Sequence, residues 1–181
     1  PSLPNQRIRL VPDKDGYQAG DTAQVFVPNP FNDTALGLLT VERGTILDYQ
    51  ILQLEPGGST IPIALTQESA PNIYVAVTLL GSDEQGYPDF RQGYTNLPVD
   101  PSFNYLNVNL TSTPERSGPG EPVSFNLRIT DADGKPEEGE FSLAVVDKAI
   151  FSLADPYEAD IYNAFYGIQP LSVQTGISLA A

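Results

Sequence analysis

The second half of the sequence repeats the first half at a constant spacing of 100 residues, within a total length of 181. The repeated elements are a strand-like tripeptide, a Gly-acid dipeptide and a second apolar alternation: Ile8-Arg9-Leu10 with Val108-Asn109-Leu110, Gly20-Asp21 with Gly120-Glu121, and Val25 and Val27 with Phe125 and Leu127. One spacing shared by a strand, a turn and a second strand indicates two copies of one module. The two halves are therefore expected to begin with the same fold.

Short runs rich in Val, Ile, Thr, Leu and Tyr lie between turns of Gly, Pro and Asn, a pattern typical of antiparallel β-sandwiches. Alternation is clear where Ile61, Ile63 and Leu65 share one face of a predicted strand. The first half contains seven predicted strands, at Arg7–Val11, Thr22–Val27, Ala35–Glu42, Ile46–Leu54, Ser59–Leu65, Ile73–Leu80 and Gln92–Val99. Seven strands complete one small sandwich, which we assign to residues 1–100.

The second half is too short for a second complete sandwich. Its predicted strands are Tyr105–Thr111, Val123–Thr130 and Glu140–Val146. A short helix is expected near residues 157–166, because Asp155 suits the N-cap and Gly167 suits the C-terminal end. The predicted fold is all-β, with two tandem fibronectin- or immunoglobulin-like antiparallel sandwiches. Residues 101–181 form the N-terminal part of the second, truncated one.

Composition excludes several classes of function. The sequence contains no Cys and no His, so it offers no thiol nucleophile, no Cys/His zinc site and no Ser-His-Asp triad. Its formal net charge is −14, which argues against a nucleic-acid partner because phosphate binding needs clustered basic residues. We therefore expect no catalytic residues, no cofactor and no nucleic-acid binding.

Two D-x-D-G sequences are candidate calcium-binding sites. Asp13 and Asp15, and likewise Asp131 and Asp133, are candidate ligands for a weak surface Ca²⁺ site. The EF-hand spacing of Gly and Glu is absent, and Asp and Gly are also the usual residues of tight turns. The turn interpretation is favoured, and the metal alternative stays open.

A charged pair, Asp147 and Lys148, interrupts the most apolar stretch of the chain. Without His, Cys or a recognised nucleophile motif beside it, a catalytic role has no support. We interpret the pair as the end of a strand or a bulge, with Ile150 and Phe151 returning to the core.

Two alternatives of other classes remain open. The tyrosines could form a sugar-stacking face, so that the chain would be a tandem immunoglobulin-like adhesin or carbohydrate-binding module. The sequence also contains 23 acidic residues, from which a carboxylate-dependent hydrolase could be built. Most of these acids lie in predicted turns, which favours an ordinary solvated surface. Tight glycan or calcium binding would favour the first alternative, and turnover abolished by one acidic substitution would favour the second.

Three long stretches resemble the bacterial alpha-2-macroglobulins. They are DGYQAGDTAQVFVPNPF at residues 15–31, ALGLLTVERGTILDYQILQL at 35–54 and SLAVVDKAIFSLADP at 142–156. In that family a Y-x-x-G-D turn opens macroglobulin-like domains, which corresponds here to Tyr17, Gly20 and Asp21. The FYGIQPLSVQTG sequence at 165–176 is similar to the approach to the protease bait region.

The resemblance implies a structural role in a broad-spectrum protease inhibitor. Such inhibitors trap a protease by changing conformation after it cuts the bait, and the bait-proximal residues here would be Leu171, Val173 and Ile177. The implied partners are target proteases and other macroglobulin-like domains, and the implied location is extracytoplasmic: periplasmic, membrane-anchored or secreted. The chain has no Cys, so the family's thioester motif does not lie in it. Open sheet edges in the truncated second sandwich would also favour self-association.

Overall fold

The computed structural model describes residues 6–118, 120–146 and 161–173. These residues form two compact units. The first unit contains the described residues up to Pro101 together with Tyr166 to Val173, and the second contains those from Ser102 to Phe165. Among the described residues, no helix is both long enough and apolar enough to cross a membrane.

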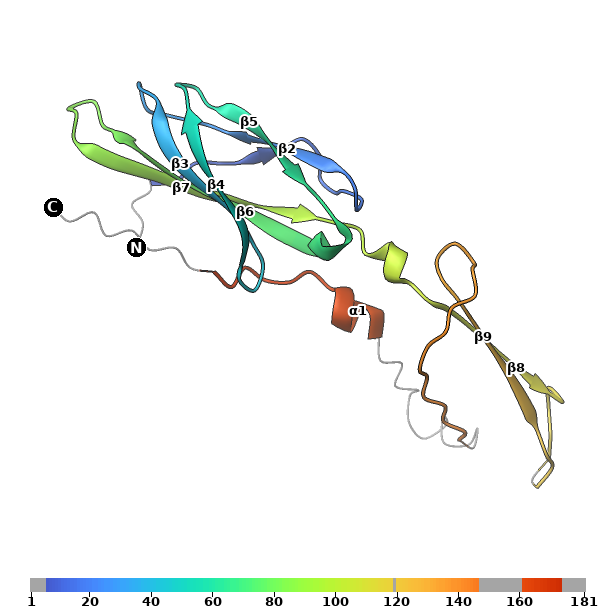
Figure 1. The fold of residues 1–181 in the computed structure, drawn as a ribbon. Coiled ribbons are helices and arrows are strands. Elements are labelled where there is room, and N and C mark those ends of the chain that lie inside the picture. The colour runs from blue at the N-terminus through green and yellow to red at the C-terminus, as the bar shows by residue number, and fades with distance from the viewer. Residues whose placement is uncertain (1–5, 119, 147–160, 174–181) are drawn as a thin grey trace. The chain divides into compact units, whose positions relative to one another are not determined.

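The first unit is a sandwich of two antiparallel sheets (Figure 1). The smaller sheet has the order β1-β2-β5, with bounds Val11–Pro12, Thr22–Val27 and Ser59–Ala64. The larger sheet has the order β4-β3-β6-β7, with bounds Ile46–Leu54, Ala35–Glu42, Asn72–Ser82 and Pro88–Pro98. A 3-10 turn, η2 at Gln67–Ser69, precedes β6. The predicted all-β class is confirmed.

The core lies between the inward faces of the two sheets. Successive side chains of a strand point to opposite faces, so every second apolar residue can be buried. Val25 of β2, Leu39 of β3 and Val75 of β6 are all 0% exposed. Burying a side chain of this size contributes about 1.5–3 kcal/mol. The alternation seen in the sequence therefore fixes which face of each strand is inward.

The predicted strand bounds agree with the structure for β2, β3 and β4. The first predicted strand is largely replaced by an irregular segment that crosses between the sheets. Arg7 forms an isolated parallel bridge with Gln92 at the edge strand β7, whereas Val11 pairs with β2 of the other sheet. Residues that bridge both sheets cannot form one continuous strand.

The second unit begins with an antiparallel pair, β8 (Asn107–Thr113) and β9 (Ser124–Thr130), preceded by η3 (Ser102–Asn104). Its pairing repeats that of the first unit: Val11 lies opposite Phe26, and Thr111 lies opposite Asn126. The preceding turns also correspond. Gly20 and Gly120 have φ values of +97° and +83°, in the left-handed region that favours glycine. The 100-residue repeat is therefore structural.

One predicted strand of the second unit is wrong. The described residues Glu140–Val146 form no strand, and Phe141, Leu143 and Val145 are exposed. Alternation alone cannot form a strand, because its backbone groups need a paired neighbour. Helix α1 is described at Ile161–Tyr166 and ends just before Gly167, as predicted. Asp155, Tyr157, and the residues Asp147, Lys148, Ile150 and Phe151 lie outside the described residues.

A glycine substitution tests the sandwich directly. Gly58 has a φ of +104°, and a Cβ there would lie 2.1 Å from the Val27 carbonyl oxygen. Gly58→Ala should therefore lower the free energy of unfolding of the first unit by about 2 kcal/mol or more, measured by urea denaturation. Gly44→Ala is the control, because its Cβ would meet nothing within 4 Å. An equal effect of both substitutions would contradict this packing.

Candidate functional site

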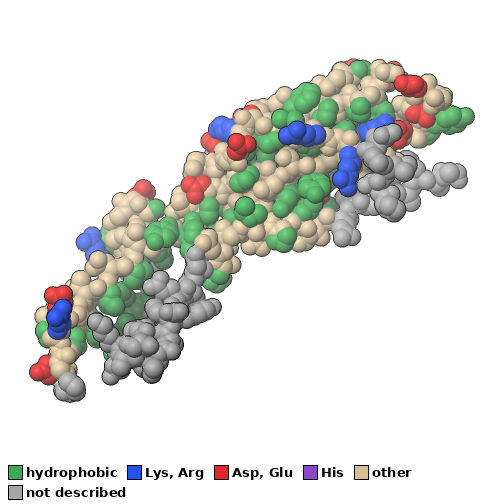
Figure 2. Space-filling model, turned by 180° about the vertical axis from the view of Figure 1, so that it is seen from behind, with side chains coloured by type: hydrophobic (Ala, Val, Ile, Leu, Met, Phe, Trp, Pro, Cys, Tyr) green, Lys and Arg blue, Asp and Glu red, His purple; other side chains and the backbone are tan. Residues whose placement is uncertain are grey.

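The outward face of the larger sheet carries large apolar side chains, which are unusual on a surface that faces solvent. Leu36 and Leu38 of β3, Ile51 of β4 and Leu80 of β6 are all exposed there. Hydrophobic side chains are visible at the surface of both units in Figure 2. Contiguous exposed apolar residues on a sheet commonly mark an interaction surface.

Two polar residues on this same outward face are buried. Thr40 and Glu42 alternate with inward-facing residues of β3, yet they are only 7% and 1% exposed. The Thr40 hydroxyl donates a hydrogen bond to Glu42 Oε1 at 2.5 Å. Outward-facing residues can be buried only where another part of the chain covers the sheet.

The described C-terminal residues of the first unit lie on this face in an extended conformation. Gln169, Leu171 and Val173 are partly buried, whereas Pro170 and Ser172 between them are exposed. This period of two is that of a strand with one face against a surface. We call residues Gly167–Val173 the docked segment.

Hydrogen bonds attach the docked segment to β6 through one backbone position. The Gln169 N–H donates to Asn72 Oδ1 at 2.8 Å, and Asn72 Nδ2 donates to the Gln169 carbonyl at 3.1 Å. The Tyr74 hydroxyl donates to the same carbonyl at 3.2 Å. Asn72 is fully buried, and its Nδ2 also donates to Asn96 Oδ1 at 2.8 Å. The side-chain oxygen and nitrogen of Asn72 and the backbone nitrogen and oxygen of Gln169 therefore all have hydrogen-bond partners.

A second attachment lies two residues beyond Pro170. The Ser172 N–H donates to the Arg43 carbonyl at 3.4 Å, and the Arg43 Nη1 donates to the Ala70 carbonyl at 2.6 Å. Arg43 directly follows β3, so this contact fixes the docked segment near the end of that strand.

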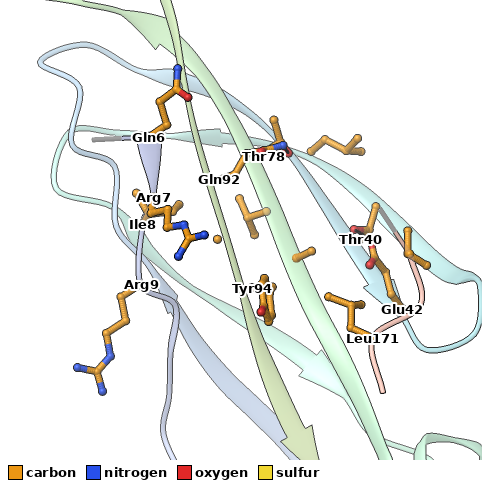
Figure 3. A pocket seen from close by; sticks show the side chains of 15 residues that line it. Gln6, Arg7, Ile8, Arg9, Thr40, Glu42, Thr78, Gln92, Tyr94 and Leu171 are labelled. Atoms are coloured by element: carbon orange, nitrogen blue, oxygen red, sulfur yellow. Dashed lines mark hydrogen bonds between the residues drawn. The ribbon is translucent and has the colours of Figure 1, made fainter. Parts of the chain in front are cut away.

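A cavity of about 700 Å³ adjoins the docked segment. Figure 3 shows Thr40, Glu42 and Leu171 on one side of it, and Arg7, Ile8 and Arg9 on the other. Between them lie side chains of β6 and β7, namely Thr78, Gln92 and Tyr94. Its lining is mixed, with aliphatic groups beside a buried carboxylate.

A second hollow of about 500 Å³ lies where the docked segment begins. Ile168 lines it together with Pro71, Pro98 and Tyr17. Tyr17 belongs to the Y-x-x-G-D turn, so this turn and the docked segment share one surface of the first unit.

Hydrogen bonds and burial shift the pKa values of three side chains in this turn. The Tyr17 hydroxyl donates to Asp13 Oδ1 at 2.8 Å, and the Gln24 N–H donates to the same oxygen at 2.8 Å. The Gln24 N–H, followed by the Tyr17 hydroxyl, lowers the pKa of Asp13. Burial, followed by the hydrogen bond to Asp13, raises the pKa of Tyr17 to about 12. The Gln18 N–H and then Lys14 lower the pKa of Asp21.

The candidate calcium ligands lie in hydrogen-bonded turns. Asp13 Oδ1 accepts the two bonds given above, and Asp131 Oδ1 accepts from the N–H groups of Asp133 and Lys135. Asp15 and Asp133 are exposed. Within residues 6–118, 120–146 and 161–173, no three acidic side chains gather into a metal-binding group. The turn interpretation thus has a specific hydrogen-bonding basis at both D-x-D-G sequences.

The repeated Gly-acid dipeptides have the same structure in both units. Asp21 Oδ2 accepts from the Gln18 N–H, and Glu121 Oε2 accepts from the Gly118 N–H, each three residues upstream. Of the predicted bait-proximal residues, Leu171 and Val173 lie at the cavity and Ile177 lies outside the described residues.

The tyrosines proposed as a sugar-binding surface are divided between the units. Tyr74 packs edge-on against Tyr94 with ring centroids 6.3 Å apart, in the first unit. Tyr105 packs in the same manner against Tyr162 at 5.5 Å, in the second. In each pair the rings contact each other edge-on within one unit, although Tyr94 and Tyr105 are exposed.

Sequence reasoning missed the residues that attach the docked segment, which are Asn72, Tyr74 and Arg43, and the buried pair Thr40 and Glu42. One signal was present: Asn72 and Tyr74 occupy outward positions of a strand whose other face is apolar. A polar outward face is nevertheless what any solvated strand shows, so this signal could not identify a partner.

The structure defines an all-β protein whose first unit is a sandwich and whose second unit begins with the same strand pairing as the first. The family model of the alpha-2-macroglobulin bait region domain matches residues 8–153. The chain therefore belongs to the alpha-2-macroglobulin family.

Similar proteins agree with this assignment. The chain is 25% identical over 170 residues to an alpha-2-macroglobulin homolog of Nostoc sp., covering 90% of this chain and 9% of that protein. It is 28% identical over 178 residues to an alpha-2-macroglobulin of Ralstonia nicotianae, covering 93% and 11%. It is 22% identical over 167 residues to that of Escherichia coli, covering 89% and 10%. The chain thus spans about a tenth of the length of these relatives.

Tyr17 in this turn should make the free energy of unfolding depend on pH in the alkaline range. Between an ordinary tyrosine pKa of 10.0 and the value of about 12 for Tyr17, the folded state keeps a proton that the unfolded state has lost. Stability supplied by neutral Tyr17 is therefore complete below pH 10 and is lost as the pH rises towards 12. Tyr17→Phe should flatten the fall in unfolding free energy across this interval, measured by urea denaturation at several pH values. Tyr87→Phe, at an exposed site, should leave the slope unchanged, and equal slopes in all three proteins would refute the prediction.

Proposed function

We propose that this chain is the scaffold that presents the bait region of an alpha-2-macroglobulin-type, broad-spectrum protease inhibitor. The observation that carries the proposal is the match of the bait region domain model to residues 8–153, which includes both repeats of the β-module. Residues 1–100 would be one macroglobulin-like domain, and residues 101–181 the N-terminal part of a second one leading into the bait.

In this proposal the chain acts by holding and releasing a peptide, and it carries out no chemical step. A sandwich with a close-packed core is a rigid support, and an extended peptide anchored to it can be presented to a protease. Cleavage of the bait would release that attachment and allow neighbouring domains to rearrange around the protease. No step requires an acid, a base or a nucleophile, so we propose that the chain is not an enzyme and needs no cofactor.

The partners and location follow from the same proposal. The partners would be target proteases, reached through the complete inhibitor, and other macroglobulin-like domains of the same protein. The inhibitor would work outside the cytoplasm, where foreign proteases are met. The absence of Cys from the sequence means that any thioester would belong to another part of the protein.

Limited proteolysis tests the scaffold proposal. Proteases bind their substrates as extended, unpaired chain, and the paired strands of the sandwich do not offer such a conformation. Brief digestion with two proteases of different specificity should therefore leave residues 6–101 intact by mass spectrometry, with the first cuts in the unpaired residues 140–146 or beyond the docked segment, after Val173. Early cuts between strands of the first unit, for example at Asp83–Gly86, would count against the proposal.

The second unit also has a surface that favours association. Val108 and Leu110 of β8 lie on one face of a sheet that has two strands in the described part of the chain, and both are exposed. A two-stranded sheet with an uncovered apolar face is marginal alone and tends to recruit a further strand or layer. We propose that this face is completed by another segment of the inhibitor, or by a second copy when that segment is missing.

Sedimentation velocity over a range of concentrations measures this association. The chain should form dimers as concentration rises, and Leu110→Lys should shift the equilibrium towards monomer at least tenfold, because a charge on an apolar interface is costly. Asn109→Lys is the matched control, since Asn109 is exposed on the opposite face of β8. A monomer at all concentrations, or equal effects of both substitutions, would refute self-association.

A further inference from the structure

We propose that the outward face of the β4-β3-β6-β7 sheet is a peptide-docking site whose occupant is the chain's own segment 167–173. Asn72 and Tyr74 recognise the backbone of one residue, and the surface beyond them selects apolar side chains at alternate positions. The docking holds the segment reversibly on the first unit. Its role as a tether upstream of the bait rests on the proposed function, whereas the docking itself does not.

The recognition of Gln169 uses backbone atoms only. The Asn72 side chain accepts from its N–H and donates to its carbonyl, the two-bond pairing that a neighbouring strand would provide. Tyr74 adds a third bond to the same carbonyl. The Gln169 side chain instead donates to its own chain, at the Gly167 carbonyl. A contact of this kind fixes the position of an extended chain while tolerating many residues at that position.

Selectivity comes from the residues that follow. Leu171 and Val173 face the sheet and line the cavity, whereas Ser172 between them faces solvent. Leu38 and Ala76 contribute aliphatic surface to the same cavity. The ligand class is therefore an extended peptide with apolar side chains two and four residues after the clamped position.

The structure also indicates that docking is reversible. Among the described residues, four hydrogen bonds attach the docked segment to the sheet and to Arg43, and the inward side chains are partly rather than fully buried. The adjoining cavity, at about 700 Å³, is of the size of ligand sites and is not filled by Leu171 and Val173. Docking also buries the Glu42 carboxyl group, whose hydrogen bond in the described part of the chain comes from Thr40. Burial of an acid with few partners opposes docking.

Amide hydrogen exchange of the intact 181-residue chain, without any protease, tests the docking site. Tyr74→Phe removes one hydrogen bond to Gln169 and should accelerate exchange at the Gln169 and Ser172 amides about fivefold, the effect of losing one such bond. Asn72→Asp removes both amide donors and should accelerate it more. Tyr94→Phe is the matched control, because Tyr94 lies beside Tyr74 but its hydroxyl makes no hydrogen bond with the described residues of the docked segment.

A second pair of variants, one test and one control, changes the docked segment itself. Leu171→Asp places a charge against the sheet and should release the docked segment, whereas Ser172→Asp places the same charge in solvent and should not. In every variant the amides of Val75 and Val77 should keep wild-type protection, which shows that the sandwich is intact. Equal acceleration by the members of either pair, or fast exchange at Gln169 in the wild-type chain, would overturn the docking site. Failure of the scaffold proposal would appear in the digestion pattern instead, with these exchange rates unchanged.

Discussion

The burial of alternate strand residues between two sheets is the constraint on which the rest of the structure depends. Val25, Leu39 and Val75 are inaccessible to solvent, so β2, β3 and β6 each have only one possible orientation. A shift of one residue in register would expose these side chains and bury their polar neighbours. The same constraint fixes Thr40, Glu42 and Tyr74 on the outward face of the larger sheet, where the docked segment lies. The core therefore determines the composition of the docking surface.

Much of the first unit could be predicted because its signals are local. Strands β2, β3 and β4 alternate clearly and are bounded by turn residues, and their predicted bounds agree with the structure. The repeated Gly-acid turns were also predictable, since a left-handed backbone at Gly20 and Gly120 strongly favours glycine. The family resemblance, carried by three long stretches, was confirmed by the bait region domain match.

What could not be predicted depends on contacts between distant residues. Residues 171–173 alternate like a strand, but nothing local indicates that Gln169 lies against Asn72, 97 positions earlier in the chain. Residues 140–146 alternate as well, yet form no strand in the structure, because pairing rather than alternation makes a strand. The buried Glu42 is a third case, since an acidic residue at an outward position ordinarily predicts exposure.

The first β-sandwich holds the docked segment, residues 167–173, in one defined position. The chain contains no Cys, so two introduced cysteines can carry spin labels without background. Exposed Ser172 of the docked segment and exposed Thr60 of β5 are suitable sites, and both lie in the first unit. Double electron–electron resonance should give one narrow distance distribution, which broadens when Asn72→Asp is added. A broad distribution in the chain with native Asn72 would contradict the account.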